Sequence, residues 1–534
     1  MRRRRKDAAN NVGISEVQAA GLPPRQRFLL ALLCLGILAI YLLWPTQNYY
    51  WDGIGFAQTI EDASSLNPSL LHPNHLIYTA AGYLEYRLLR AAGLTMRSLT
   101  VLQWTNMLLS TAAAYLLFTM LLECGGSLYL STSLTLLFSF SATWWKFSTD
   151  ANSYVPSVFF LLLGCRWLLP RRSSRPVALA LAHTLAMLFH QLAALFFPAA
   201  VCGLFLQNRS SGRRQTVSAV LQYSGIAFAC TLAAYFAGFH WQQQSLDWVA
   251  FLRWLTAHSP EVSFSFDPWA NTVYSLRGHV RLLLGGRIAA VLGQREPATM
   301  ALSLVSLALV SVWVFQTFRH RAGWGRRRVA ECAANARQRP LLGLLSVWVA
   351  AYLVFLFFWL PGNTFYRLFY FPALVLLGGL LLASWEGRGE TARKSRLGLL
   401  AAAVAVFNLA FYIIPNSRVE SNPPLDFALR MRRVWNRETL IYYREFNTDN
   451  WTIRYFNPET SWKLLDANRL PELEAELQQG EAGGEAAWLD TTAWEQLGSL
   501  PEGAHWLSEH AVPDAYEERL DTGHRIRFQK IRPR

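Results

Sequence analysis

Runs of apolar residues separated by short polar segments dominate the first 414 positions of the chain. A helix of about 20 mainly apolar residues crosses the hydrocarbon core of a bilayer. With 52% hydrophobic and only 16% charged residues, the whole chain is too apolar for an ordinary soluble protein. The pattern predicts a polytopic all-α membrane protein with about eleven transmembrane helices, at 28–44, 99–122, 128–145, 155–169, 177–189, 192–206, 216–239, 298–318, 341–360, 368–385 and 397–414.

One segment between the first two predicted helices interrupts the apolar pattern. Residues 75–90 include Glu85, Arg87 and Arg90, and each charge at the centre of a bilayer costs roughly 2.5–3.5 kcal/mol on insertion scales. We therefore interpret this segment as an amphipathic helix that lies in the plane of the outer membrane surface. If it crossed the membrane, the later basic segments "RRSSR" and "QNRSSGRR" would fall on the outside.

The charge distribution fixes the expected orientation. The net charge is +15, but the first 414 residues carry 35 Lys and Arg against 15 Asp and Glu, whereas the rest of the chain has 15 against 20. The positive excess lies in short clusters beside apolar runs, which is typical of cytoplasmic loops. We expect contact with membrane lipid and no nucleic acid partner. The basic segment 1–27 is expected in the cytoplasm and the C-terminus outside, most simply in a bacterial inner membrane with a periplasmic tail; an endoplasmic reticulum membrane is the alternative.

The tail has the composition of a water-soluble domain. We divide the chain into a segment 1–27, a transmembrane domain 28–414 and an extracytoplasmic domain 415–534. In the tail, "ETLIYYREF" and "TIRYF" predict strands, "LPELEAELQQ" predicts a helix, and "HRIRFQKIRPR" alternates as an edge strand does. We expect a small α/β or α+β domain without a catalytic motif.

The loops expected on the outer side collect unusual polar residues. Carboxylates, histidines and arginines at one depth of a membrane protein indicate a water-filled cavity, although any single one of them could simply face water. The first loop has Asp52, Glu61 and Asp62. The later segments contribute His72, His75, Lys146, Asp150, Asn152, Tyr154, His190, Arg277, His279, Arg281, Arg287, Tyr366 and Arg367.

A metal site is a competing interpretation of these residues. His72 and His75 have a spacing that zinc ligands use, and Asp52 could join them. Pro73 lies between the histidines, however, and no H-E-x-x-H motif or outer cysteine accompanies them. We therefore predict no zinc site and leave open a divalent cation, Mg²⁺ or Mn²⁺, as a cofactor.

The order of these features resembles a known group of enzymes. The stretches "WDGIGFAQ", "HPNHLIYTAAGYL", "DANSYVPSVFFLLL" and "LAMLFHQLAALFFPAA" resemble the motifs of the GT-C superfamily of polyprenyl-phosphate-dependent membrane glycosyltransferases. The nearest pattern is that of the bacterial relatives of the transmembrane protein O-mannosyltransferases, and it covers roughly residues 28–205. The chain departs from it at Gly55, where the family has a second acid, and at Asn152, where the family has Glu, with Asp150 two residues earlier.

The resemblance implies a reaction and roles for the outer residues. A sugar would move from a polyprenyl-phosphate donor to a hydroxyl of a glycan, lipid or protein acceptor, with inversion at the anomeric carbon. Asp52 would be the general base. Arg277, Arg281, Arg287 and Arg367 are candidates for stabilising the leaving phosphate. The remaining residues expected to bind substrate are His72, His75, Asp150, Asn152, Tyr154, His190 and Tyr366.

Two other function classes stay open at this point. An O-antigen polymerase or ligase also has many spans and a large outer loop with arginines. A transporter would place charges inside its spans and show internal repeats, which this chain lacks. An in-plane helix next to the first acidic loop would favour the glycosyltransferase.

Overall fold

A computed structural model gives the fold of the chain. It describes residues 23–169, 173–209, 211–257, 264–286, 288, 297–319, 338–383, 390–445, 447–466, 469–482, 486–519 and 525–533. The chain forms two compact units. We call the first, Met1–Pro45 with Ile60–Ile414, the bundle. The second, Thr46–Thr59 with Pro415–Arg534, we call the C-terminal unit.

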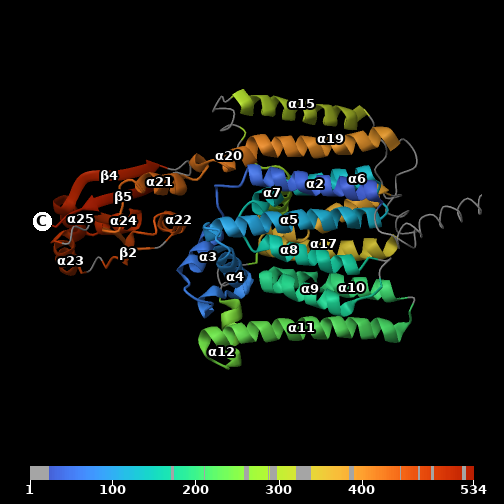
Figure 1. Cartoon of the computed structure of the whole chain (residues 1–534), viewed down its shortest axis with the longest axis horizontal. Helices are drawn as coiled ribbons and strands as arrows, with labels where there is room; N and C mark the ends of the chain where they lie inside the picture. The colour runs from blue at the N-terminus through green and yellow to red at the C-terminus, as the bar shows by residue number, and fades with distance from the viewer. Residues whose placement is uncertain are drawn as a thin grey trace, which may run out of the picture. The chain divides into compact units, whose positions relative to one another are not determined.

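Eleven apolar helices within the described residues make up most of the bundle, and many of them run side by side (Figure 1). Six are long and apolar enough to cross a membrane: α2 (Pro24–Leu43), α5 (Ser98–Glu123), η3 with α10 (Gln191–Phe196 and Phe197–Asn208), α11 (Arg213–Gln243), α17 (Arg339–Trp359), and the segment Arg396–Asn416, which includes most of α19 (Glu390–Asn408), η5 (Leu409–Ile413) and α20 (Ile414–Asn416).

Five further apolar helices are shorter. They are α6 (Leu128–Ser139), α8 (Tyr154–Trp167), α9 (Pro176–Phe189), the central part of α15 (Pro297–Arg319), and α18 (Phe371–Ala383). An apolar helix therefore lies at each of the eleven predicted ranges, and the predicted class, a helical membrane protein with a small C-terminal domain, is confirmed.

One predicted span is broken in two. The range 128–145 was expected as one helix, but α6 ends at Ser139 and α7 (Ala142–Ser148) starts after the extended residue Ser141. The side chain of Asn408 explains how the break is tolerated. Its Nδ2 donates to the backbone oxygens of Phe140 and Leu283, both at 2.8 Å, and its Oδ1 accepts from the backbone N–H of Gly285 at 3.1 Å. The carbonyl of Phe140 thus has a partner away from water.

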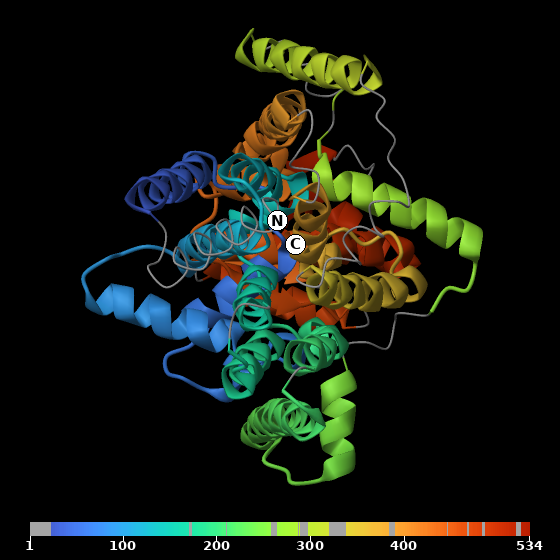
Figure 2. The ribbon, with the colours of Figure 1, turned by 90° about the vertical axis from the view of Figure 1, so that its right-hand side faces the viewer.

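Three amphipathic helices lie across the axes of the long ones (Figure 2). The predicted in-plane helix is α4 (Tyr78–Ala91), which follows a short turn, η2 (Pro73–His75), and buries Tyr78 and Tyr83. The others, α12 (Trp248–Thr256) and α13 (Pro268–Leu283), begin at aspartate caps: Asp247 accepts from the N–H of Val249, and Asp267 from those of Trp269 and Ala270. Both α4 and α12 lie at the same end of the bundle (Figure 1).

The C-terminal unit contains a five-stranded mixed sheet with helices, an α+β fold. The strand order is β2-β1-β3-β5-β4; β1 pairs in parallel with β2 and β3, and β5 pairs antiparallel with β3 and β4. The strands are β1 (Thr439–Tyr443), β2 (Ser461–Leu464), β3 (Ala486–Leu489), β4 (Ala511–Arg519) and β5 (Arg525–Ile531). The helices are α21 (Pro423–Met431), α22 (Thr448–Phe456), α23 (Leu470–Ala482), α24 (Thr491–Ser499) and α25 (Pro501–His510).

Two local predictions for the tail were wrong. "TIRYF" lies in helix α22, because Asn447 caps the helix by accepting from the N–H of Asn450 at 2.9 Å, and Ile453 and Tyr455 are buried. The last strand, β5, lies between β3 and β4, so the sheet edge on that side is β4. The strand β1 in "ETLIYYREF" and the helix α23 in "LPELEAELQQ" are confirmed.

Candidate functional site

A buried ion pair follows the break after α6. The ammonium of Lys146, on α7, bonds the carboxylate of Asp150, four residues later and just past the end of that helix. Asp150 is fully buried, and its Oδ1 also accepts from the backbone N–H of Ala151 at 2.8 Å. Lys146 lies over the ring of Phe147 at 4.7 Å. A buried carboxylate with this many partners is held in one orientation.

Side chains of α5 hold the loop that carries Asp150. Gln103 Nε2 donates to the carbonyl of Thr149 at 2.8 Å, and Asn106 Nδ2 donates to the carbonyls of Asp150 and Asn152 at 2.7 and 2.9 Å. Asn152 in turn starts α8, since its Oδ1 accepts from the N–H groups of Tyr154 and Val155 at 3.1 and 3.2 Å. The side chain of Asn152 therefore holds the backbone at the start of α8 in place.

Three predicted binding residues from distant segments meet beside this loop. The ring centres of Tyr154 and His190 are 5.0 Å apart, those of His190 and Tyr366 are 5.7 Å apart, and those of Tyr154 and Tyr366 are 5.9 Å apart. Tyr366 lies on the short helix η4 (Phe365–Phe369). His190 accepts a hydrogen bond from the N–H of Leu192 at 3.1 Å, and burial together with the nearby His72 lowers its pKa to about 3. His190 is therefore neutral at physiological pH.

The two predicted histidines of the HPNH stretch stack on each other. Their ring centres are 4.2 Å apart, and His72 caps η2 by accepting from the N–H of Asn74 at 3.3 Å. The turn η2 contacts η3, which begins directly after His190. In the part of the chain that the structure describes, no three His, Cys, Asp or Glu side chains are grouped so that they could hold a metal ion.

Arg367 is 1% exposed and lies in a polar nest of its own. Its guanidinium donates to the hydroxyl of Tyr370 at 2.8 Å, to the carbonyl of Pro361, and more weakly to Ser275 Oγ at 3.4 Å, with His279 Nε2 at 3.5 Å. Its Nε is buried without a hydrogen-bond partner, and among the described residues no carboxylate forms an ion pair with it. Arg367 is thus a buried cation whose charge no described carboxylate balances.

The other predicted arginines do not join this nest. Arg277 and Arg281 lie on α13 with exposed side chains, whereas Gly278 of the same helix faces Arg367. A Cβ atom at Gly278 would come within 2.5 Å of Arg367 Nε, so this glycine makes room for the guanidinium. Arg281 contributes its backbone carbonyl, which accepts from Thr143 Oγ1 at 3.0 Å. Arg287 lies outside the described residues.

The acids of the first loop lie on α3 (Trp51–Asp62) and differ in their surroundings. Glu61 is bound to Arg97 by two hydrogen bonds from Nε, both at 2.9 Å, and an ion pair at 2.8 Å, and it accepts from the backbone N–H and hydroxyl of Ser98 at 2.9 Å each. It therefore fixes the start of α5. Asp62 is exposed. Asp52, in the first turn, is half-buried, and burial raises its pKa to about 7 against a smaller lowering by Tyr50.

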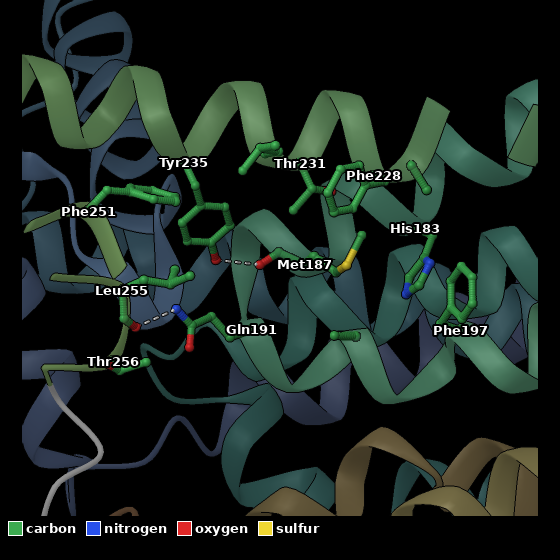
Figure 3. Close-up of a pocket in the computed structure, with 13 residues that line it drawn as sticks. His183, Met187, Gln191, Phe197, Phe228, Thr231, Tyr235, Phe251, Leu255 and Thr256 are labelled. Carbon is green, nitrogen blue, oxygen red and sulfur yellow. Dashed lines mark hydrogen bonds between the residues drawn. The ribbon is translucent and has the colours of Figure 1, made fainter. Parts of the chain in front are cut away.

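An apolar pocket of about 620 Å³ lies between α9 and α11 and is closed at one end by α12 (Figure 3). Its polar side chains are hydrogen-bonded within the protein. His183 bonds Tyr223 at 2.7 Å and the carbonyl of Ala193 at 2.9 Å, Tyr235 donates to the carbonyl of Met187 at 3.1 Å, and Gln191 donates to the carbonyl of Pro73 at 2.9 Å. The wall therefore favours an apolar ligand.

The pocket is elongated along the helices. Gln191, Leu255 and Thr256 lie toward one end, and His183 and Phe197 toward the other (Figure 3). The lining residues of α11 run from Ala227 to Tyr235, which is about 12 Å at 1.5 Å per residue. Gln191, at the α12 end, directly follows His190 of the aromatic group.

Comparison with known proteins adds a likeness in fold. The crystal structure of ArnT from Cupriavidus metallidurans bound to undecaprenyl phosphate aligns with a TM-score of 0.52 over 94% of this chain and 97% of that one, at 12% sequence identity. The fold is shared. The apo form of ArnT aligns with a TM-score of 0.45 over the same shares, at 11% identity. No family model and no curated protein matches the sequence.

Several groups at the site were not anticipated from the sequence. Gln103 and Asn106 lie in the first third of an apolar span, where a polar side chain is itself a signal of function or packing. Tyr370 bonds both Arg367 and His279. It lies at the start of an apolar run, and nothing in the local sequence indicated that it would be part of the site. Lys146 and Asp150 are only four residues apart, but Asp150 follows the end of α7, so a helical spacing rule does not predict their pairing.

Proposed function

We propose that this chain is a membrane glycosyltransferase that moves a sugar from a polyprenyl-phosphate donor to an acceptor hydroxyl. The observation that carries the proposal is the likeness in fold to ArnT over 94% of the chain, because the ArnT structure holds undecaprenyl phosphate, a polyprenyl phosphate. The resemblance of residues 28–205 to GT-C motifs supports the same donor class independently of the fold.

The pocket between α9 and α11 is suited to the apolar part of the donor. Its wall is apolar, its polar groups have partners within the protein, and it extends about 12 Å along two helices expected to span the membrane. A prenyl chain in the pocket would have its polar end near Gln191. The sugar and phosphate would then lie toward the group of Tyr154, His190 and Tyr366.

Arg367 is the residue that we assign to the donor phosphate. Its buried charge has no carboxylate partner among the described residues, so an anion nearby would be stabilised strongly in this low-dielectric setting. A phosphate leaving group gains negative charge as the glycosidic bond breaks. Arg367 would therefore favour the transition state as well as binding of the donor.

Asp52 is the group that we propose as general base. Its carboxylate takes the proton of the acceptor hydroxyl while that oxygen attacks the anomeric carbon, and the bond between this carbon and the phosphate oxygen breaks. The polyprenyl phosphate leaves with the bonding electron pair, and the configuration inverts. A pKa of about 7 suits a base at physiological pH.

We further propose that the reaction takes place on the outer face of a bacterial inner membrane. The positive charges between the predicted spans support an N-terminus in the cytoplasm and a C-terminal unit in the periplasm. The subfamily resemblance makes polyprenyl-phosphate mannose the first donor to test. The acceptor is a hydroxyl of a glycan, a lipid or a protein.

The test uses the purified full-length protein in nanodiscs with radiolabelled polyprenyl-phosphate sugars and envelope fractions as acceptor. We expect a labelled product, and we expect Asp52→Asn to reduce transfer by about 10²–10⁴-fold, the usual contribution of general base catalysis. The matched control is Asp62→Asn, on the same helix but exposed. Absence of transfer from every polyprenyl-phosphate sugar, with donor binding intact, would contradict the proposal.

A further inference from the structure

The segment that carries Asp52 belongs to the C-terminal unit, although it follows directly after the first span. Backbone hydrogen bonds attach the start of this segment to the rest of the unit. The N–H groups of Gln47 and Asn48 both donate to the carbonyl of Asn416, at 2.7 and 3.1 Å, and Asn422 Nδ2 donates to the carbonyl of Gln47 at 2.9 Å. The side chains of Asn48 and Asn416 are bonded at 3.0 Å. Both backbone and side-chain hydrogen bonds therefore join the start of the segment to Asn416 and Asn422.

Aromatic contacts continue the attachment on both sides of Asp52. Tyr49 stacks on Phe456 with ring centres 5.9 Å apart and planes within 20°, and Trp51 lies against Trp451 at 5.7 Å. One turn further along α3, a Cβ atom at Gly55 would meet the Trp451 ring at 3.7 Å. Helix α22 thus contacts the segment before and after the acid.

Helix α22 is itself rigidly built into the C-terminal unit. Asn450 is 3% exposed and donates to the carboxylate of Asp490 at 2.7 Å, and Asn457 donates to the carbonyl of Ala428 at 3.0 Å. Ile453 of α22 is fully buried in the core formed with β1, β3 and β5. Movement of α22 would therefore require rearrangement of this core.

We infer that the C-terminal unit is a positioning element of the transfer reaction: it holds the segment 46–59, and with it Asp52, through Asn416, Trp451 and Phe456. This inference rests on the proposed function, in which Asp52 is the base. Trp451 and Phe456 are positioning residues, because they act on Asp52 through the segment. A domain without a catalytic motif thereby influences the rate of transfer, since a misplacement of about 1 Å can cost on the order of 10²-fold in rate.

The first part of the test measures hydrogen exchange of the full-length protein in nanodiscs, and needs no activity. Trp451→Ala should speed exchange of the amides of 48–58 at least tenfold, Trp451→Phe should restore most of the protection, and Tyr516→Ala, a partly exposed aromatic on β4, should leave it unchanged. Tyr49→Ala, which leaves the domain core intact, should act like Trp451→Ala. Unchanged exchange in both Trp451→Ala and Tyr49→Ala would overturn the inference.

The second part measures transfer against pH for the same variants. Trp451→Ala should lower kcat about 10–100-fold and move the acidic midpoint of the profile toward the ordinary range of an aspartate, while Trp451→Phe keeps the wild-type midpoint. If exchange rises but kcat and midpoint stay unchanged in Trp451→Ala, while Asp52→Asn abolishes transfer, positioning is refuted. If Asp52→Asn itself retains full transfer, the assignment of the base fails, and the exchange data alone decide whether the unit holds the segment.

Discussion

The proposed role of Asp52 as general base predicts how transfer depends on pH. Burial raises the pKa of this carboxyl from 3.8 to about 7. A general base works only when it is ionised, so the rate should be lost as the pH falls through this value and should reach a plateau above it. An aspartate at its ordinary pKa would give a rate that is flat over the whole neutral range.

The size of the effect can be worked out. With a pKa of about 7, the ionised fraction rises from about one tenth at pH 6 to about nine tenths at pH 8, so kcat/KM should rise about tenfold between them. Two histidines described at the site, His190 and His279, have lowered pKa values. The pKa of His190 is lowered to about 3, so this histidine is neutral throughout the interval, and burial and Arg367 lower the pKa of His279.

The assay is the rate of sugar transfer by the protein in nanodiscs, with donor binding measured separately at each pH. His72→Gln is the control, because an unperturbed histidine titrates near pH 6.5 and could imitate an aspartate with a raised pKa. The acidic limb should persist in His72→Gln. A flat profile between pH 6 and pH 8 in the wild type, or loss of the limb in His72→Gln, would refute the reasoning about Asp52.

Three other predictions concern the arginine nest, the acid that starts α5, and the topology. Arg367→Ala should raise the Kd for the donor and also lower kcat, because a phosphate contact acts in both the ground state and the transition state; the exposed Arg277→Ala should change neither, and equal effects would contradict the assignment. Glu61→Gln should lower the free energy of unfolding by about 2 kcal/mol, since the negative charge that strengthens the bonds from Arg97 and Ser98 is lost along with one acceptor oxygen, whereas Asp62→Asn should stay within about 0.5 kcal/mol in thermal unfolding. A reporter fused after Arg534 should behave as extracytoplasmic, and a cytoplasmic signal would reverse the predicted orientation.

The apolar pattern of the sequence predicted the bundle well, because a membrane imposes one strong requirement on each helix: length and apolar character. It could not show where a helix breaks. The helix in the predicted span 128–145 ends early, and the carbonyl of Phe140 at the break is bonded by Asn408, far along the chain. In the tail the aromatic content of "TIRYF" favoured a strand, and the cap at Asn447 together with burial of Ile453 decided for a helix.

The candidate site was predicted in part. Tyr154, His190 and Tyr366 were each proposed from their loops, and the structure brings them together. Arg277 and Arg281 were proposed on the same grounds and remain exposed on α13. Which face of an amphipathic helix packs inward depends on its neighbours, here the guanidinium of Arg367 against Gly278. The attachment of the Asp52 segment to the C-terminal unit depends on stacking between residues far apart in sequence, and no local pattern encodes it.

The bonds of Asn408 also bear on the order of events during synthesis. The free carbonyl left by the break between α6 and α7 receives its partner from a residue 268 positions later. The same side chain bonds the end of α13, 125 residues before it. When the first helices leave the ribosome and enter the bilayer, this donor does not yet exist, and unpaired backbone groups are costly in lipid. The carbonyl of Phe140, between α6 and α7, must therefore bond water or another temporary partner until the last helix has been inserted. Asn408 thus stabilises the bundle only at the end of synthesis. Its loss should leave insertion of the early helices intact while impairing the final packing of the bundle.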